Sequence, residues 1–352
     1  LRRYRKIVRI VLPYNDHLGK FSKTNFVGGI EKFCVQIMET YDDVHIINID
    51  NKEKPKHNTD KIKMFAKEKN ADIIISNWHQ ASFVGSSITD SEIPIMFVYH
   101  ALPSFSSMLN NVYNLKRMNH SCFFVSEYQL SIINEMTKRF KTDKIEADGF
   151  INSSFVRGDK PKLNDIEYDC ITIGRCEPTE KKPFLLKEYL KDTDYKSMLI
   201  TTHPRSDKER KYIDKNSDWD NVLMGIEHSK AMEHLSKSMT YFSTMPFETW
   251  GITALEALSH GVPIILNAKK MKHSSESIPA SKRHYKNILW DKKVGSEQLI
   301  SAIESFRNMD RKEIQDMTWD KHSHSEWKRN FSNCIDKTLD NFKKNNKFEK
   351  FT

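Results

Sequence analysis

Short, nearly continuous apolar runs recur along the first half of the chain and alternate with segments of helical periodicity. The runs predict strands at residues 7–12, 44–49, 72–76, 95–99 and 122–125. The helical patterns lie at residues 30–40, 61–68 and 128–140. Strands that are apolar at almost every position are typical of a parallel sheet covered on both faces. We therefore expect a doubly wound α/β domain in residues 1–157.

A second series of the same kind follows a polar stretch at residues 152–165, which we interpret as a linker. Strands are predicted at residues 170–173, 198–202, 222–225, 240–243 and 263–266. Helical patterns lie at residues 183–190, 229–236 and 253–259. A second Rossmann-like domain is thus expected in residues 158–318, and a cleft between two such domains suits a nucleotide-type ligand.

The amino-acid composition indicates which kind of partner the protein binds and in which cellular compartment it resides. The 56 basic and 47 acidic residues give a net charge of +9, which favours a nucleotide, a nucleic acid or an acidic surface. Five scattered cysteines without a CxxC pair fit a reducing compartment better than a disulfide framework or a structural zinc site. No signal peptide is visible, and the longest apolar stretch is too short to cross a bilayer. We expect a cytoplasmic protein without an integral membrane segment.

Residues 247–263 are the most informative segment. A predicted strand leads through a loop to Gly251, a helical pattern follows, and Gly261-Val262-Pro263 precedes the next strand. The amides of Gly251, Ile252 and Thr253 would stand at a helix start, where amides have no intrahelical acceptor. Such amides, reinforced by the helix dipole, suit a diphosphate.

Two carboxylates in this segment have alternative interpretations. Spacing alone favours a structural one, in which Glu248 caps the helix and Glu256 is a solvated helix residue. In the functional one, both accept hydrogen bonds from sugar hydroxyls. Because Glu256 stands in the apolar run 252–258, its carboxylate should have a partner.

Residues 247–263 resemble the donor-site motif of retaining glycosyltransferases of the GT-B fold (glycosyltransferase group 1). The matching positions are Glu248 and Glu256, separated by seven residues, Gly251, and Gly261-Val262-Pro263. The resemblance implies two Rossmann-like domains facing each other across a cleft, with a nucleotide sugar on the second. It implies that Glu248 binds the hexose hydroxyls and Glu256 the ribose hydroxyls. The amides at Gly251, Ile252 and Thr253 would bind the diphosphate.

The resemblance extends to residues 173–182. In the family, Gly-Arg after a strand is followed by a loop and a Lys, and the Arg and Lys grip the donor diphosphate. Here these residues are Arg175 and Lys181. Lys182 stands where the family usually has Gly, which leaves open whether Lys181 or Lys182 makes the contact.

Further segments of the chain resemble the same family. Gly28 and Gly29 match the glycine-rich turn that opens the first helix and approaches the donor phosphates. Residues 148–155 resemble the segment that closes the first domain. Residues 323–331, with Trp327, resemble the late helix that crosses back to the N-terminal domain. Residues 319–352 are accordingly assigned to that helix and a basic tail.

Two more positions have both a catalytic and a structural interpretation. His100 follows the strand at 95–99, where active-site residues of such sheets gather, and a His at this place in the family contacts the transferred sugar. A lone His after a strand is more often a satisfied loop residue, but with the whole motif set we favour the catalytic role. Ser126-Glu127 resembles a Ser-Glu pair of the family, and a helix N-cap followed by an acidic first turn explains it equally well.

The resemblance implies retention of anomeric configuration, a uridine-linked donor and no metal. Two DxD triplets, Asp192–Asp194 and Asp218–Asp220, have the spacing with which transferases of another fold hold a divalent cation. Each lies in a polar loop before a predicted strand, and we interpret both as turns.

The acceptor has competing interpretations. The segments at residues 71–76, 97–100, 109–117 and 28–33 resemble phage DNA α-glucosyltransferases. With basic clusters at residues 1–6, 114–117 and 269–272, this makes a hydroxymethylated pyrimidine in double-stranded DNA the leading hypothesis, in the host cytoplasm if the protein is phage-encoded. A cell-surface or lipid-linked glycan is the alternative acceptor. A nonenzymatic nucleic-acid-binding protein would explain the charge but not the motifs, and a sugar-nucleotide epimerase is a third possibility.

Overall fold

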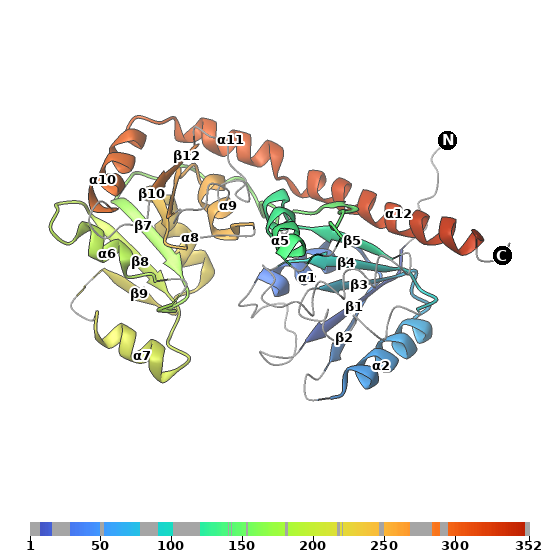
Figure 1. Ribbon diagram of the computed structural model, residues 1–352. Helices are drawn as coiled ribbons and strands as arrows, with labels where there is room; N and C mark the ends of the chain where they lie inside the picture. Colours follow the sequence, from blue (N-terminus) through green and yellow to red (C-terminus); the bar gives the residue numbers. More distant parts are fainter. Residues whose placement is uncertain are drawn as a thin grey trace. The chain divides into compact units, whose positions relative to one another are not determined.

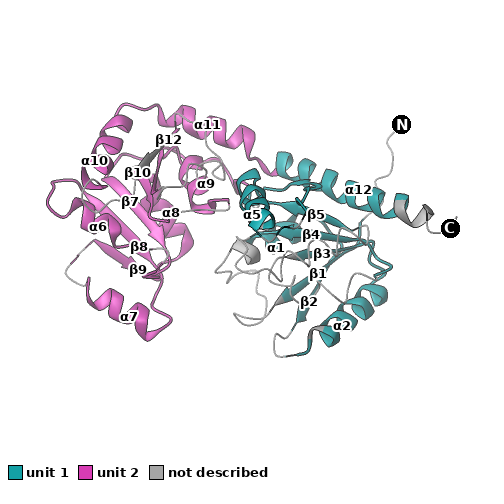
Figure 2. Ribbon diagram, viewed as in Figure 1, with its two compact units in different colours: residues 1–154, 325–352 teal, residues 155–324 magenta. Residues whose placement is uncertain are grey.

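The computed structural model describes residues 8–15, 29–49, 53–77, 91–100, 120–139, 141, 143–152, 154–179, 182–216, 219, 221–245, 250–267, 284–288 and 295–348. The chain divides into two compact units (Figures 1 and 2). Unit 1 comprises residues 1–154 and 325–352, and unit 2 comprises residues 155–324. Each unit is built around its own parallel sheet.

The described part of unit 1 contains a six-stranded parallel sheet in the order β2-β1-β3-β4-β5-β6. Its strands are β1 (Ile10–Asn15), β2 (Val44–Ile49), β3 (Ile73–Asn77), β4 (Ile95–Tyr99), β5 (Ser121–Phe124) and β6 (Gly149–Phe150). Its helices are α1 (Gly29–Thr40), α2 (Pro55–Glu68), α5 (Glu127–Arg139) and α12 (His324–Phe348).

Side chains that alternate along the strands build the core of unit 1. Val11, Ile74 and Phe97 share a buried cluster with Ile62 of α2 and Ile133 of α5, so these two helices cover one face of the sheet. Helices α1 and α12 pack on each other through aromatic rings. The ring of Phe33 lies 5.8 Å from that of Phe331 and 6.2 Å from that of Trp327.

The described part of unit 2 contains a second six-stranded parallel sheet, ordered β12-β11-β10-β7-β8-β9. Its strands are β7 (Tyr168–Gly174), β8 (Ser197–Thr201), β9 (Val222–Met224), β10 (Ser238–Ser243), β11 (Ile264–Asn267) and β12 (Tyr285–Ile288). Its helices are α6 (Leu185–Leu190), α7 (Asp207–Asp214), α8 (His228–Ser236), α9 (Ile252–Ser259), α10 (Gly295–Phe306) and α11 (Arg311–Lys321).

Helices cover both faces of the second sheet. One face packs on α8, α9 and α11, where Ile171 and Ile264 meet Leu235, Leu258 and Ile314. The other face packs on α6 and α10 through a separate cluster that contains Cys170, Phe242, Leu186 and Ile303. Burial from both sides explains why every residue of β8, β10 and β11 is buried, and it confirms the predicted doubly wound α/β class.

Three elements escaped the sequence prediction for identifiable physical reasons. Helix α7 has no buried residue, so it has no apolar face to detect. Strand β6 has only two residues, and β12 reads Tyr-Lys-Asn-Ile, so Lys286 and Asn287 interrupt any apolar run. The strand predicted at residues 7–12 lies three residues further along the chain. The strand runs over Ile10–Asn15 because its register pairs Ile10 with Val44 and Asn15 with Ile49.

Candidate functional site

The order of strands in unit 2 creates one topological switch point. Strands β7, β8 and β9 succeed one another toward one edge, and β10, β11 and β12 toward the other, so β7 and β10 are neighbours. In open parallel sheets, ligands bind outside the carboxyl ends of the strands at such a point. Arg175 directly follows β7, and the chain after β10 leads to Gly251 and α9. Arg175 and the segment that leads to α9 therefore leave the carboxyl ends of two neighbouring strands.

The two central strands are held in register beneath this site. Tyr241 of β10 pairs with Ile171 of β7. The buried hydroxyl of Thr172 donates a 2.7 Å hydrogen bond to the carbonyl of Phe242. Because this bond ties a side chain of one strand to the backbone of the other, the loops that follow both strands start from a rigid base.

Gly251 gives α9 its entry geometry. Its φ of 72° lies in the left-handed region, where a residue with a side chain is strained. Gly251 is the N-cap, and its carbonyl accepts the first helical hydrogen bond from the Leu255 amide at 3.0 Å. The amides of Ile252 and Thr253 thus stand in the first turn, where the helix dipole favours an anion.

The face of α9 that is not packed into the core carries the predicted donor-binding residues. Ile252, Thr253 and Glu256 are half-buried, whereas Ala254, Leu255 and Ala257 are buried. Residues three and four apart share one face of a helix. The predicted residues of this helix therefore point in a common direction, away from the hydrophobic cluster.

Glu256 has the partner that its apolar surroundings required. Its Oε1 lies 3.0 Å from Nε2 of His228, and 17% of the Glu256 side chain is exposed against 66% of the His228 side chain. His228 begins α8, shortly after β9 ends at the same edge of the sheet. Sequence reasoning missed His228, since the two residues are 28 positions apart. Its place just beyond a strand end was the available signal.

Arg175 opens a compact loop between β7 and α6. Its side chain is exposed, and its carbonyl accepts a 2.8 Å hydrogen bond from the Glu177 amide. The next residue, Cys176, is buried, and burial raises the pKa of its thiol to about 11, so it is a packing residue rather than a nucleophile. Lys182, at the other end of the loop, donates its amide to the Glu177 carbonyl at 2.8 Å.

His203 and Gly225 meet at the adjacent strand ends of the same edge. Gly225 follows β9 with a φ of 64°, and a β-carbon at this position would overlap the ring of His203, which follows β8. The Arg205 amide donates to Oε2 of Glu209 at 2.6 Å, and Ser206 caps α7. These residues thus lie at the carboxyl ends of β8 and β9, the two strands that follow β7 in the order of the sheet.

Unit 1 places His100 against helix α1. Gly29 begins α1, and His100 follows β4. The His100 ring contacts Phe33 of α1 edge-on, with centroids 4.6 Å apart. Ser126 accepts a 3.2 Å hydrogen bond from the Gln129 amide, which confirms its interpretation as the N-cap of α5.

Several predicted positions lie outside the described residues. They are Gly28, Lys181 and Glu248, as well as Asp218 and Asp220 and the basic clusters at 1–6, 114–117 and 269–272. Asp192 lies in a turn after α6, as the sequence predicted. Across the described part of the chain, no group of three His, Cys, Asp or Glu side chains could hold a metal ion.

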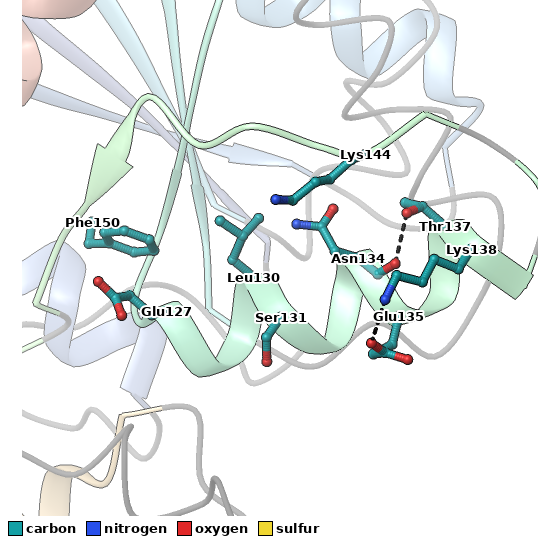
Figure 3. A pocket seen from close by; sticks show the side chains of 9 residues that line it. All are labelled: Glu127, Leu130, Ser131, Asn134, Glu135, Thr137, Lys138, Lys144 and Phe150. Carbon is teal, nitrogen blue, oxygen red and sulfur yellow. Dashed lines mark hydrogen bonds and ion pairs between the residues drawn. The ribbon is translucent and has the colours of Figure 1, made fainter.

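Two open cavities lie on unit 1, and Glu127 is the one residue with a catalytic interpretation among those that line them. One, of about 580 Å³, runs along α5 and is lined by Glu127, Lys144 and the half-exposed ring of Phe150 (Figure 3). In the second, of about 560 Å³, Met64 of α2 lies beside β2. Among the helices that the structure describes, none combines the length and apolar character needed to span a bilayer.

Comparison with known proteins relates the fold to solved structures. No family model matches the chain, and no curated protein matches its sequence. A glycosyltransferase from Rickettsia africae ESF-5 matches with a TM-score of 0.67 and 11% identity over 96% of this chain and 99% of that one. The lipopolysaccharide outer core galactosyltransferase WaaB matches with a TM-score of 0.65 and 14% identity over 93% and 99%.

A third solved structure contains a bound nucleotide. The pneumococcal O-GlcNAc transferase GtfA in complex with UDP and GlcNAc matches with a TM-score of 0.56 and 13% identity, over 79% of this chain and 60% of that one. At these identities the likeness concerns the fold. The chain has the α/β architecture of GT-B glycosyltransferases, with two parallel-sheet Rossmann-like domains.

Proposed function

We propose that the protein is a glycosyltransferase that moves a sugar from a nucleotide-diphosphate donor to a hydroxyl acceptor. The observation that carries the proposal is that Arg175, whose side chain is exposed, follows β7, while the chain after the neighbouring strand β10 leads to the amides that open α9. A cation and helix-start amides at one place suit a leaving diphosphate, whose negative charge grows in the transition state.

In this proposal each residue binds a different part of the nucleotide-sugar donor. Arg175 and the amides of Ile252 and Thr253 neutralise the diphosphate, and Glu256 binds the ribose hydroxyls in the place where it now pairs with His228. Glu248 binds the hexose and Lys181 assists Arg175. His100 and Gly29 in unit 1 serve the transferred sugar and the acceptor side.

The reaction proposed is metal-independent and retains the anomeric configuration. The acceptor oxygen bonds to the anomeric carbon on the same face from which the diphosphate leaves, and the leaving phosphate accepts the proton of the acceptor hydroxyl. No carboxylate nucleophile takes part in this step. Uridine is the proposed base, and the similar fold of an O-GlcNAc transferase solved with UDP and GlcNAc supports this choice.

Two acceptor classes remain in the proposal on different grounds. Hydroxymethylated DNA rests on the net charge of +9 and on basic clusters of the sequence. A glycan acceptor rests on the similarity of fold to enzymes such as the lipopolysaccharide galactosyltransferase WaaB. The domain division follows the same scheme, with the acceptor on the N-terminal unit and the donor on the C-terminal unit.

A screen for release of nucleoside diphosphate tests the function and separates the acceptors. UDP-, GDP-, ADP-, CDP- and dTDP-sugars are incubated alone, with hydroxymethylated double-stranded DNA, with unmodified DNA, or with oligosaccharides. A transferase accelerates release only when its acceptor is present, and NMR of the product reports the anomeric configuration. Identical release with and without every DNA removes the DNA hypothesis, and no release from any sugar nucleotide refutes the proposal.

The donor site is tested by a pair of arginine variants. Arg175→Ala is expected to lower kcat/KM about 100-fold or more, because it removes a charge that stabilises the leaving group. Arg210→Ala, at an exposed position of α7, should leave kcat/KM unchanged. Equal activities of the two variants would contradict the assigned site.

A further inference from the structure

One histidine of unit 2 is bonded to the carboxylate that the proposed function assigns to the ribose. Nε2 of His228 lies 3.0 Å from Oε1 of Glu256. An ionised carboxylate only accepts hydrogen bonds, so the ring nitrogen is the donor. The His228 ring is largely exposed, whereas the Glu256 carboxylate is half-buried. Because a carboxylate with little access to water depends on the donors that the protein supplies, this one bond has a strong effect on where the carboxylate points.

The turn after β9 determines where His228 lies. Strand β9 ends at Met224, and the Gly225 amide donates to the Thr201 carbonyl at 2.9 Å. Gly225 has a φ of 64°, and the ring of His203 occupies the space that a β-carbon would need. Glycine therefore fits this turn and a larger residue does not, and α8 begins three residues later at His228.

Helix packing fixes the distance between the two side chains. Ala231 of α8 and Ala254 of α9 belong to one buried cluster, so both helices lie on the same face of the sheet. Within α9, the Glu256 carbonyl accepts hydrogen bonds from Oγ of Ser259 and from Nδ1 of His260, each 2.8 Å long. The backbone of Glu256 is thus held by its own helix, whereas its carboxylate is held by the neighbouring helix.

We propose that His228 is a positioning residue that holds the Glu256 carboxylate toward the ribose hydroxyls and so makes the protein prefer ribonucleotides to 2′-deoxyribonucleotides. The inference rests on the proposed function, in which Glu256 binds the ribose. A carboxylate offers about four lone-pair sites, and the bond from His228 uses only one of them. A carboxylate that is already oriented loses little freedom when the hydroxyls bind, so each hydroxyl contributes more to affinity. A nucleotide without the 2′-hydroxyl leaves part of the oriented carboxylate without its donor.

A ratio of two dissociation constants separates this role from a structural one. UDP, GDP, ADP, CDP and dTDP are titrated calorimetrically into the whole chain, and the tightest ribonucleotide is then compared with its 2′-deoxy form in parent and variants. General damage to the site weakens both forms alike, whereas loss of positioning acts through the ribose hydroxyls and lowers the ratio. His234→Ala is the matched control, because His234 lies on the same helix but contacts Tyr168 at the start of β7.

In the parent, the 2′-deoxy form should bind about tenfold more weakly, which corresponds to the loss of one charged hydrogen bond. Glu256→Ala should abolish this ratio, and His228→Ala should lower it about threefold or more. His228→Gln, which keeps an N–H donor, should recover most of the ratio, and His234→Ala should leave it unchanged. Each variant should stay folded at 25 °C, since the His228 ring is largely exposed, and thermal unfolding checks this.

Three outcomes would overturn this inference and leave the proposed transfer reaction standing. They are a parent-like ratio in His228→Ala, equal affinity of the parent for the two forms of the nucleotide, and binding of dTDP alone among the five nucleotides. If the parent chain binds none of the five nucleotides, the inference and the proposed function are both overturned.

Discussion

His322 shows how burial of one titratable ring makes stability depend on pH. Its residue is 4% exposed, its ring contacts that of Trp250 edge-on at 5.9 Å, and neither ring nitrogen has a partner among the described residues. Burial, with a smaller contribution from Lys321, lowers the pKa of His322 to about 4. The neutral ring is therefore the native form.

The sign of the resulting pH effect follows from linkage. In the unfolded chain this histidine takes up a proton near pH 6.5, whereas in the folded chain it does so only near pH 4. Unit 2 should therefore lose up to roughly 3 kcal/mol of stability as the pH falls from about 6.5 to about 4. His322→Leu should remove this loss and leave stability at pH 7 equal or higher, since no hydrogen bond is broken. Urea unfolding of parent and variant at several pH values measures the difference, and parallel curves would contradict it.

At the scale of elements, one arginine joins the ends of two helices of unit 2. Arg311, the first residue of α11, donates to the carbonyls of Ser236 at 2.6 Å and Asn164 at 2.9 Å. It also donates to the carbonyls of Gly261 and His260, each at 3.3 Å. Ser236 ends α8, and His260 and Gly261 follow α9, so this guanidinium satisfies backbone groups that helix ends leave unpaired. Burial lowers the pKa of Arg311, but the group remains charged.

Removal of this guanidinium should be costly because several carbonyls, among them those of the buried residues Ser236 and Gly261, would lose this donor at once. We expect Arg311→Met to lower the free energy of unfolding of unit 2 by about 3 kcal/mol. Arg307→Met is the matched control. Arg307 pairs with Glu304 at 2.6 Å on the surface, where solvent screens the pair, so its loss should change stability little. Chemical denaturation measures both variants, and equal losses would show that Arg311 does not join these helix ends.

At the scale of the whole molecule, the end of the chain returns from unit 2 to unit 1. Helix α12 comes after unit 2 in the sequence, yet from Ser325 onward it belongs to unit 1. The Trp327 indole donates to the Asn152 carbonyl at 2.8 Å, and its ring stacks on Phe331 at 4.7 Å, beside Phe33 of α1. The core of unit 1 is thus completed by the last helix of the chain.

Because α12 completes unit 1, loss of its packing should destabilise unit 1 and not unit 2. Trp327→Ala should destabilise unit 1 by about 3–5 kcal/mol through the loss of a buried aromatic ring, whereas Lys328→Ala at the next, exposed position should change little. Hydrogen exchange resolved by peptide should show faster exchange in unit 1 of the Trp327 variant and parent-like exchange in unit 2. Equal acceleration in both units would mean that α12 stabilises the molecule as one cooperative body.

The class of fold could be predicted from the amino-acid pattern, since strands buried on both faces are apolar at nearly every position, as β4 is. The pattern also predicted that Glu256 has a partner, because a lone carboxylate in an apolar helix cannot stay uncompensated. The roles given to all the site residues stay predictions, namely those of Gly28, Gly29, His100, Arg175, Lys181, Glu248, Gly251, Ile252, Thr253 and Glu256. The folded chain was needed to learn that β7 lies beside β10, that His228 reaches Glu256, and that Lys182 has a left-handed backbone. Local patterns report how each segment is buried, whereas strand order and contacts between distant segments depend on how the whole chain packs.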